Sequence, residues 1–253
     1  RVRRLRGFGC WPRPAAYYER NAWAGELAAG DTWVLDGPHN NALAHSVNFM
    51  CFLAGSKAEA SAQPVSIRAE LYRAKPIRTA DTVAMLARTA EGVEIFFAVS
   101  HSAEENRVPG FAVDTDTAVL DVGFDNSVTV RWKDGRPDEE LIPATEVQEA
   151  SSVEGAIARV GGDPSAKVCE LEVARAQTLC ACGSFESSPV RELPTDLHVE
   201  GPNGAVAIDG MSAAVQAAFA EGRLFSDLGL DWAVPGEEID LVDYRYFPTF
   251  RTL

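Results

Sequence analysis

The feature that most constrains the fold of this chain is one strongly apolar segment followed by segments of alternating polarity. Residues 38–55 place apolar side chains at helical spacing, between Pro38 at the start and Gly55 at the exit. Residues 65–73 then alternate apolar and polar side chains, which is typical of a half-buried strand. Because a helix this apolar must be covered on most sides, we expect a sheet to pack around it.

Three further segments of the first half are predicted to be strands, at 82–89, 93–101 and 110–121. The turn at Glu91-Gly92 joins the first two as a hairpin. A central apolar helix followed by long antiparallel strands is the pattern of a hotdog fold, in which a curved sheet wraps the helix. The first half of the chain is therefore predicted to form one hotdog unit.

The second half repeats this pattern in part. We expect a strand-like segment, a helix and two short strands there, at 167–185, 205–221, 229–234 and 239–247. Few residues follow this helix, so the second unit is either abridged or cut short. The predicted fold is α+β, a double hotdog with a first unit at 1–125 and a second unit at 166–253. A crossover linker at 126–165 joins them and carries one short helix near 146–159.

Composition excludes several classes of function. The 23 Lys and Arg residues and 37 Asp and Glu residues give a net charge of −14, which disfavours nucleic-acid binding. No apolar run reaches the ~18 residues of a membrane span. Five cysteines without dense spacing favour free thiols and a reducing, cytoplasmic location. The chain begins with Arg1 and no signal-peptide core follows, so we expect a processed or trimmed product.

Asp209 is the candidate catalytic residue of the second half. It is predicted to lie within an apolar helix, where a carboxylate could act as a general base that polarises water. The alternative is an aspartate that favours the start of a helix or a capped surface position. His39 and His45 could likewise be a general base or a carbonyl donor, or simply core or capping histidines. Their spacing of six residues does not support a metal site, and we expect none.

Asn40 and Asn41 open the first helix, where free backbone N–H groups and side-chain amides could hold a carbonyl oxygen. The alternative is helix capping. Gly7 and Gly9 supply the first two glycines of a dinucleotide fingerprint, but Pro12 stands where the third would be. No Walker-type loop is present either, and we expect no cofactor.

The stretch from Tyr17 to Ala44, with Trp33 ahead of Gly37-Pro38, resembles the opening of acyl-CoA thioesterase-like double-hotdog proteins. The resemblance extends through residues 69–77 and covers about residues 17–120, with a weaker likeness at 198–222. It implies that Asp209 activates water against a thioester and that Gln216 is a candidate polar partner. Asn40-Asn41 replaces the Gly-Gly pair of that family.

The predicted function is hydrolysis of an acyl thioester, with acyl-CoA or a carrier-protein-bound acyl group as the substrate. Asp209 and His45 are the candidate catalytic residues, and His39, Asn40, Asn41 and Gln216 the candidate substrate-binding residues. One alternative is a dehydratase, isomerase or cyclase on a polyketide-like thioester that uses His45 with Asp209. Another is a non-catalytic, ligand-binding hotdog protein. Hotdog sheets pair edge to edge, so a homo-oligomer is plausible.

Overall fold

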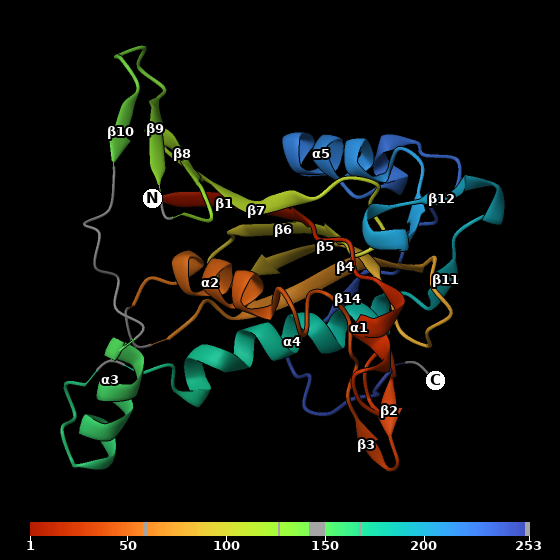
Figure 1. Cartoon of the computed structure of the whole chain (residues 1–253). Coiled ribbons are helices and arrows are strands. Elements are labelled where there is room, and N and C mark those ends of the chain that lie inside the picture. Colours follow the sequence, from red (N-terminus) through yellow and green to blue (C-terminus); the bar gives the residue numbers. More distant parts are fainter. Residues whose placement is uncertain (58–59, 126, 142–149, 167, 251–253) are drawn as a thin grey trace.

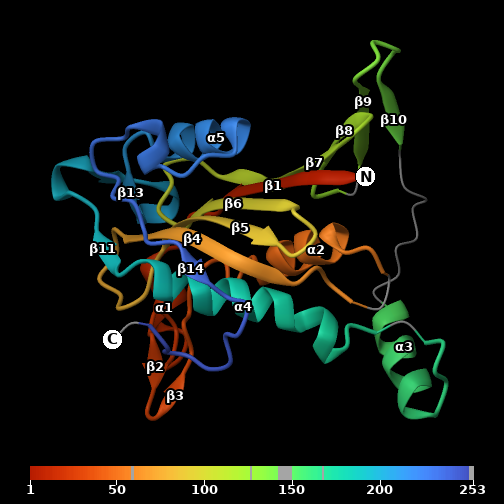
Figure 2. The same ribbon diagram turned by 180° about the vertical axis from the view of Figure 1, so that it is seen from behind.

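One mixed sheet of ten strands dominates the protein, with helices on both of its faces (Figures 1 and 2). The structure is a computed structural model that describes residues 1–57, 60–125, 127–141, 150–166 and 168–250. The predicted double hotdog is wrong, because strands from the beginning, middle and end of the chain join one sheet instead of wrapping two separate helices.

The strands are arranged in the order β10-β9-β8-β7-β1-β6-β5-β4-β11, and β14 also pairs with β4. Only β1–β6 and β4–β11 are parallel among the pairs of this sheet. Two small hairpins lie outside it, β2 (Ala28–Ala29) with β3 (Thr32–Trp33) and β12 (His198–Glu200) with β13 (Val206–Ile208). The strands of the large sheet are β1 Val2–Cys10, β4 Pro64–Arg73, β5 Thr82–Thr89, β6 Glu94–Ser100, β7 Arg107–Thr115, β8 Ala118–Val122, β9 Val128–Trp132, β10 Glu139–Leu141, β11 Val190–Glu192 and β14 Ile239–Asp240.

The helices are divided between the two faces of the sheet. α2 and α4 lie against one face, with the short α1 on the same side, and α5 lies against the other (Figure 1). α3 lies away from the sheet, beyond the N-terminal end of α4 (Figures 1 and 2). The α-helices are α1 Ala15–Glu19, α2 Ala44–Ala54, α3 Ala150–Val160, α4 Leu171–Ser187 and α5 Met211–Glu221, and short 3-10 turns occupy Thr195–Leu197, Pro202–Gly204 and Ser226–Leu228. None of the helices described is both long and apolar enough to cross a bilayer.

The larger core lies between the sheet and the α2 and α4 helices. Met50 of α2 and Phe97 of β6 are fully buried in it. Gly7 of β1 lies beneath them, where a Cβ atom would come within 2.9 Å of the Phe97 ring and 3.1 Å of the Met50 sulfur. Gly183 of α4 is similar, because a Cβ atom there would lie 2.6 Å from Ile67 of β4. These two glycines allow both helices to approach the sheet closely.

A second core lies under α5 on the opposite face. Phe96 and Val215 are fully buried there. Tyr72, Phe225 and Trp232 extend this core, with ring centroids 5.0–6.2 Å apart. Phe96 and Phe97 are neighbours in β6, and consecutive residues of a strand point to opposite faces. A single strand therefore supplies an aromatic ring to each core.

Three of the four strands expected in the first half are confirmed, and the fourth, predicted as one strand, is divided between two. Residues 65–73, 82–89 and 93–101 correspond to β4, β5 and β6, and 110–121 spans parts of both β7 and β8. The predicted helix at 38–55 is correct only from Ala44, because hydrogen-bonded turns occupy the residues before it. The hotdog prediction failed because the predicted strands belong to a larger sheet. In that sheet β1, which was not predicted, lies between β7 and β6.

The second half departs further from expectation. Residues 167–185 were predicted to be strand-like, but 171–187 form α4, and Cys180 and Cys182 lie on this helix. Small residues hide its helical periodicity, because Ala, Gly, Ser and Cys give weak apolar signals. No strand forms at 229–234, and β14 alone occupies the last predicted strand. α3 lies where a short helix was expected, although the first residues of that prediction fall outside the described part of the chain.

Candidate functional site

The outward side of α2 carries two hydrogen-bonding side chains beside the exposed ring of Phe49, whereas its inward side is mostly apolar. Val47 and Met50 are fully buried against the sheet. His45 is exposed, and Asn48 is half-buried. These two residues are three positions apart, so they lie on one face of the helix. Asn41 lies about one turn earlier along the chain. We call Asn41, His45 and Asn48 the polar row.

A buried aspartate fixes the start of the polar row. Asp36 accepts hydrogen bonds from the Asn41 side-chain amide and from the Gly25 backbone N–H, both at 2.6 Å. A buried carboxylate is costly unless hydrogen bonds replace its lost hydration, and here both of its oxygens have a donor. The Asn41 amide is therefore held in one orientation beside the start of α2.

Asn40 and His39 take part in the packing next to the polar row. The Asn40 side-chain oxygen accepts a hydrogen bond from Gln177 of α4 at 3.0 Å. His39 is fully buried, with its ring 5.7 Å from that of Phe185. Burial lowers the pKa of His39 to about 4, so the imidazole is neutral at pH 7. These contacts join the turn before α2 to α4.

The structure places Asp209 and Gln216 far from these residues. Asp209 is exposed in the turn between β13 and α5, where Gly210 has a φ of 73°, and not within an apolar helix. Gln216 is half-buried on α5. α5 covers the face of the sheet opposite to α2 (Figure 1), so the sheet separates Asp209 from His45. These two candidate catalytic residues are not brought together.

A ladder of alternating aromatic and cationic side chains lies along the segment that contains α1, beside His101 at the end of β6. The Arg13 guanidinium lies 4.1 Å from the centroid of Trp11 and 4.8 Å from that of Tyr17. The Arg20 guanidinium lies 3.8 Å from Tyr17 and 5.1 Å from Trp23. We call these five residues the cation–aromatic ladder. The sequence analysis missed it, although the alternation is visible between positions 11 and 23 of the sequence.

A buried polar cluster lies behind the ladder. The Lys75 ammonium group donates hydrogen bonds to the His101 backbone oxygen at 2.8 Å and to the Ser102 hydroxyl. The Tyr18 hydroxyl lies 3.3 Å from Nδ1 of His101. Burial is the main cause that lowers the pKa of Lys75, and Asp81 opposes it. Burial also places the pKa of His101 well below its ordinary value. This cluster braces the β4–β5 connection.

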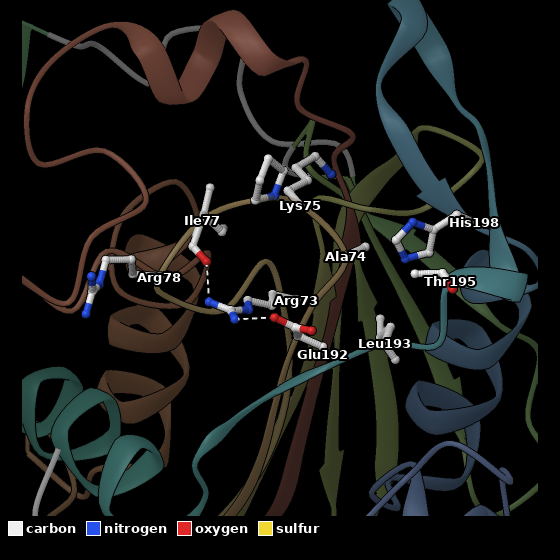
Figure 3. A pocket seen from close by; sticks show the side chains of 10 residues that line it. Arg73, Ala74, Lys75, Ile77, Arg78, Glu192, Leu193, Thr195 and His198 are labelled. Carbon is white, nitrogen blue, oxygen red and sulfur yellow. Dashed lines mark hydrogen bonds and ion pairs between the residues drawn. The ribbon is translucent and has the colours of Figure 1, made fainter.

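Two pockets lie on either side of that connection. The larger, of about 470 Å³, lies between the β4–β5 connection and the segment after β11 (Figure 3), where Arg73 is held by Glu192 and by the backbone oxygen of Ile77. The smaller, of about 280 Å³, is lined by residues that include Tyr18 and Lys75. Neither of these two pockets is lined by a predicted site residue.

Comparison of the sequence with known proteins found no matching family model and no matching curated protein. Solved structures do match, at low identity. The WlbA dehydrogenase from Bordetella pertussis, in complex with NADH and UDP-GlcNAcA, superposes with a TM-score of 0.55 and 16% identity, over 74% of this chain and 54% of that one.

UDP-N-acetylglucosamine 3-dehydrogenase GnnA from Acidithiobacillus ferrooxidans gives a TM-score of 0.52 at 16% identity, over 72% of this chain and 52% of that one. Levoglucosan dehydrogenase, in complex with NADH and levoglucosan, gives 0.54 at 16% identity, over 74% and 56%. The chain thus spans about half the length of the structures it matches. At this level of identity the likeness establishes the fold.

These matches overturn the thioesterase-like resemblance and the functions drawn from it. The three structures named above are dehydrogenases, and two of them are complexes with NADH and a sugar or nucleotide sugar. The predictions of a thioester hydrolase, of a dehydratase or cyclase, and of a non-catalytic hotdog protein are therefore wrong. The hotdog reading rested on a helix followed by strands, and an open sheet with a covering helix produces the same pattern.

The starts of α4 and α5 do not fit the pyrophosphate of a nicotinamide dinucleotide. Such cofactors place their pyrophosphate at a helix N-terminus that follows a parallel strand and a glycine-rich turn. The nearest equivalent is the turn through Gly210 into α5, but the Glu104 carboxylate already accepts the Ser212 backbone N–H there, at 2.9 Å. A carboxylate in this position repels phosphate. The start of α4 follows another acid, Glu170, which is paired with Arg159.

Proposed function

We propose that this chain is the sugar-binding half of an NAD(H)-dependent dehydrogenase, and that the dinucleotide is held by a unit outside these 253 residues. One observation carries the proposal. About three-quarters of the chain superposes on about half of each of two dehydrogenases solved with NADH and a sugar or nucleotide sugar. The misfit of the α4 and α5 N-termini to a pyrophosphate supports the assignment of the cofactor to another unit.

The polar row is the proposed sugar-binding surface. Sugar hydroxyls both donate and accept hydrogen bonds, and the exposed imidazole of His45 can do the same. The amides of Asn41 and Asn48 add donors, although each already makes one hydrogen bond, to Asp36 and to the Cys169 sulfur respectively. Asp36 orients the first of these groups. His45 is exposed and has no hydrogen-bond or ion-pair partner among the described residues, so its imidazole is free to accept the proton of a bound hydroxyl. No further step of the reaction is assigned to this chain.

Saturation-transfer NMR with UDP-N-acetylglucosamine and, separately, levoglucosan tests the proposal. We expect transfer to the sugar-ring protons of at least one of these ligands. His45→Ala should weaken its binding about tenfold, as expected for loss of about 1.4 kcal/mol of hydrogen bonding. Asp209→Asn is the matched control, because it alters an exposed polar residue on the opposite face.

Two results would contradict this proposal. One is an absence of transfer to the ring protons of both sugars, measured on folded protein. The other is equal binding by the parent chain and His45→Ala, which would remove the polar row from the site. Because His45 is exposed, its replacement by alanine is expected to leave the fold intact.

A further inference from the structure

Two arginines of the cation–aromatic ladder have no carboxylate partner. The chain carries a net charge of −14, and arginines elsewhere, such as Arg3 and Arg131, pair with aspartates. Arg13 and Arg20 form no ion pair with any carboxylate of the described residues. In so acidic a chain, two adjacent unpaired guanidinium groups mark a place where an anion from outside would be stabilised.

The ladder is built on supported backbone. The backbone N–H groups of Trp11 and Arg13 donate to the oxygens of Ser100 and His101, at 2.9 and 3.0 Å, which extends the pairing of β1 with β6. Tyr17 lies on α1. At the far end, the Asn21 side chain accepts hydrogen bonds from two backbone N–H groups, including that of Trp23 at 3.1 Å. The stacked side chains are therefore displayed from fixed positions.

The stacking geometry leaves terminal N–H groups of both arginines without a partner among the described residues, whereas the Arg13 Nε is buried. A guanidinium group stacks through its flat face, whereas its N–H groups point outward in the plane. The side chain of Arg20 uses one nitrogen for the Tyr17 backbone oxygen, and the others remain free. Planar guanidinium edges match phosphate oxygens, often in pairs. Trp23 is 38% exposed, so an aromatic face at the end of the ladder is open to a second planar ring.

The ladder and the polar row are neighbours. Trp23 is followed two residues later by Gly25, whose N–H binds Asp36, and Asp36 in turn holds Asn41. The other end of the ladder follows β1, where Gly9 lies against Leu43 at the start of α2, since a Cβ atom on Gly9 would come within 2.8 Å of that side chain. The chain segments that precede and follow the ladder are thus both tied to residues at the start of α2.

We infer that the cation–aromatic ladder binds the nucleoside diphosphate portion of a nucleotide-linked sugar. Arg13 and Arg20 take the phosphates, an exposed ring of the ladder stacks on the base, and the polar row receives the sugar. The inference rests on the proposed sugar-binding function and narrows its substrate class. A free sugar, such as an unphosphorylated anhydrosugar, would leave both guanidinium groups unused.

Calorimetric titration of the chain with UDP, uridine and inorganic pyrophosphate tests the inference. UDP is expected to bind more tightly than either uridine or pyrophosphate, because only UDP offers both a base and phosphates. Arg13→Gln and Arg20→Gln should each weaken UDP binding about tenfold or more. Arg175→Gln is the matched control, because Arg175 is an exposed arginine that also lacks a carboxylate partner but lies on α4.

The Arg20→Lys variant separates charge from planar stacking. It retains the positive charge on an exposed side chain, so it is expected to fold and to bind UDP with an affinity between those of the parent and Arg20→Gln. Equal UDP affinity in the parent and in the Arg13→Gln/Arg20→Gln double variant would overturn the inference. Pyrophosphate that binds as tightly as UDP would also overturn it, by showing a simple anion site.

His45→Ala distinguishes failure of this inference from failure of the proposed function. The variant should leave UDP affinity unchanged but remove the extra affinity that the sugar gives to UDP-N-acetylglucosamine. If UDP binds through the ladder and the sugar adds nothing, the proposed function fails and the nucleotide site stands. If a free sugar binds at the polar row and UDP does not bind, the ladder inference alone fails.

Discussion

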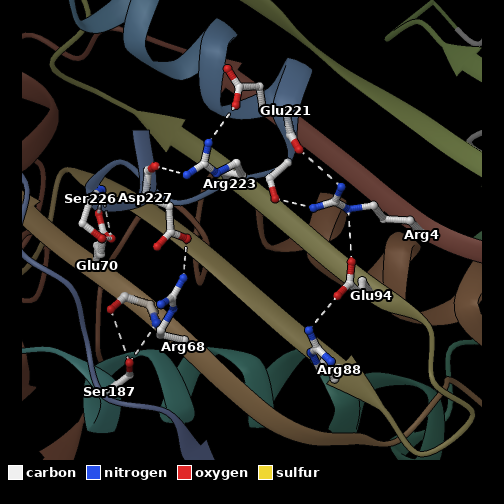
Figure 4. Close-up of polar contacts among 12 residues, drawn as sticks. Arg4, Arg68, Glu70, Arg88, Glu94, Ser187, Glu221, Arg223, Ser226 and Asp227 are labelled. Atoms are coloured by element: carbon white, nitrogen blue, oxygen red, sulfur yellow. Dashed lines mark hydrogen bonds and ion pairs between the residues drawn. The ribbon is translucent and has the colours of Figure 1, made fainter. Parts of the chain in front are cut away.

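On the face of the sheet that carries α5, several arginines pair with carboxylates of the same chain, whereas Arg13 and Arg20 stack on aromatic rings and pair with no carboxylate of the described residues. Figure 4 shows the first arrangement, in which Glu94 lies between Arg4 and Arg88, and Arg68 pairs with Asp227. Arg6 on the same face bonds to backbone oxygens of α5 instead. The comparison therefore favours the ladder over the α5 face as the place where an external anion binds.

The largest expected effect separates the two cores. Phe97→Ala and Phe96→Ala each remove a fully buried ring, and each should lower the free energy of unfolding by about 3–5 kcal/mol. Only Phe97 lies in the core under α2, so only Phe97→Ala should also weaken sugar binding at the polar row. Urea unfolding and ligand titration measure the two effects. A comparable loss of sugar binding in Phe96→Ala would contradict the claim that only the core under α2 supports the polar row.

A smaller effect concerns the buried histidine beside α4. The pKa of His39 is about 4 in the folded chain, against an ordinary value of 6.5. Between these values the unfolded chain takes up a proton that the folded chain does not, so stability should fall as the pH drops from 6.5 to 4. At about 1.4 kcal/mol per pKa unit, the loss approaches ~3 kcal/mol near pH 4.

Urea unfolding from pH 7 to pH 4.5 measures this dependence. His39→Gln is expected to have a lower free energy of unfolding at pH 7 than the parent, but a smaller decrease as the pH falls. His101 should account for part of the remaining decrease, because burial lowers its pKa as well. His45→Gln, at an exposed position on α2, serves as the control and should keep the parent's decline. An equal decline in His39→Gln and the parent would show that His39 is not the neutral buried group described.

The smallest expected effect lies on the α5 face. Glu94→Gln removes the carboxylate between Arg4 and Arg88, whose side chains are 27% and 60% exposed. Surface ion pairs of this kind contribute about 0–1 kcal/mol, so the free energy of unfolding should change by no more than that. Ligand binding at the polar row should be unaffected. A large fall in sugar or UDP binding would show that the ion pairs of the α5 face are part of the site.

The strands of the first half were predictable because their alternation is strong and their turns are short. β4, β5 and β6 carry buried Val, Ile, Leu and Phe side chains, and the Glu91-Gly92 turn marks the hairpin between the last two. β1 escaped prediction because basic residues, among them Arg4 and Arg6, occupy alternate positions. Those residues face the α5 side, where both bond to carbonyl oxygens at the end of α5.

The second half was harder because its signals are weak or depend on distant partners. α4 is rich in Ala, Gly, Ser and Cys, which give a weak apolar pattern. Gly183 allows α4 to pack closely against Ile67 of β4, and this contact between distant residues cannot be predicted from local sequence. The β11 and β14 strands are short and exist because they add to β4. The sheet topology therefore could not be read from local sequence, and a reading based on local pattern alone produced a hotdog.

The proposed sugar site shares two residues with the candidates chosen from the sequence. His45 and Asn41 were chosen there for a reaction on a thioester, and both belong to the polar row. The ladder was missed because its residues were considered one at a time, although Trp11, Arg13 and Tyr17 alternate within a short segment. Asp209 was chosen because it was predicted to be a carboxylate inside an apolar helix. In the structure α5 begins only after Gly210, so Asp209 lies outside the helix.

Backbone amide NMR of the labelled chain, titrated with UDP-N-acetylglucosamine, tests most directly whether the chain binds a sugar through α2. The account predicts that the largest shifts occur at Asn41, His45 and Asn48, with the α5 region around Asp209 unchanged. Shifts confined to the α5 side of the sheet, or no shifts at saturating ligand, would contradict it.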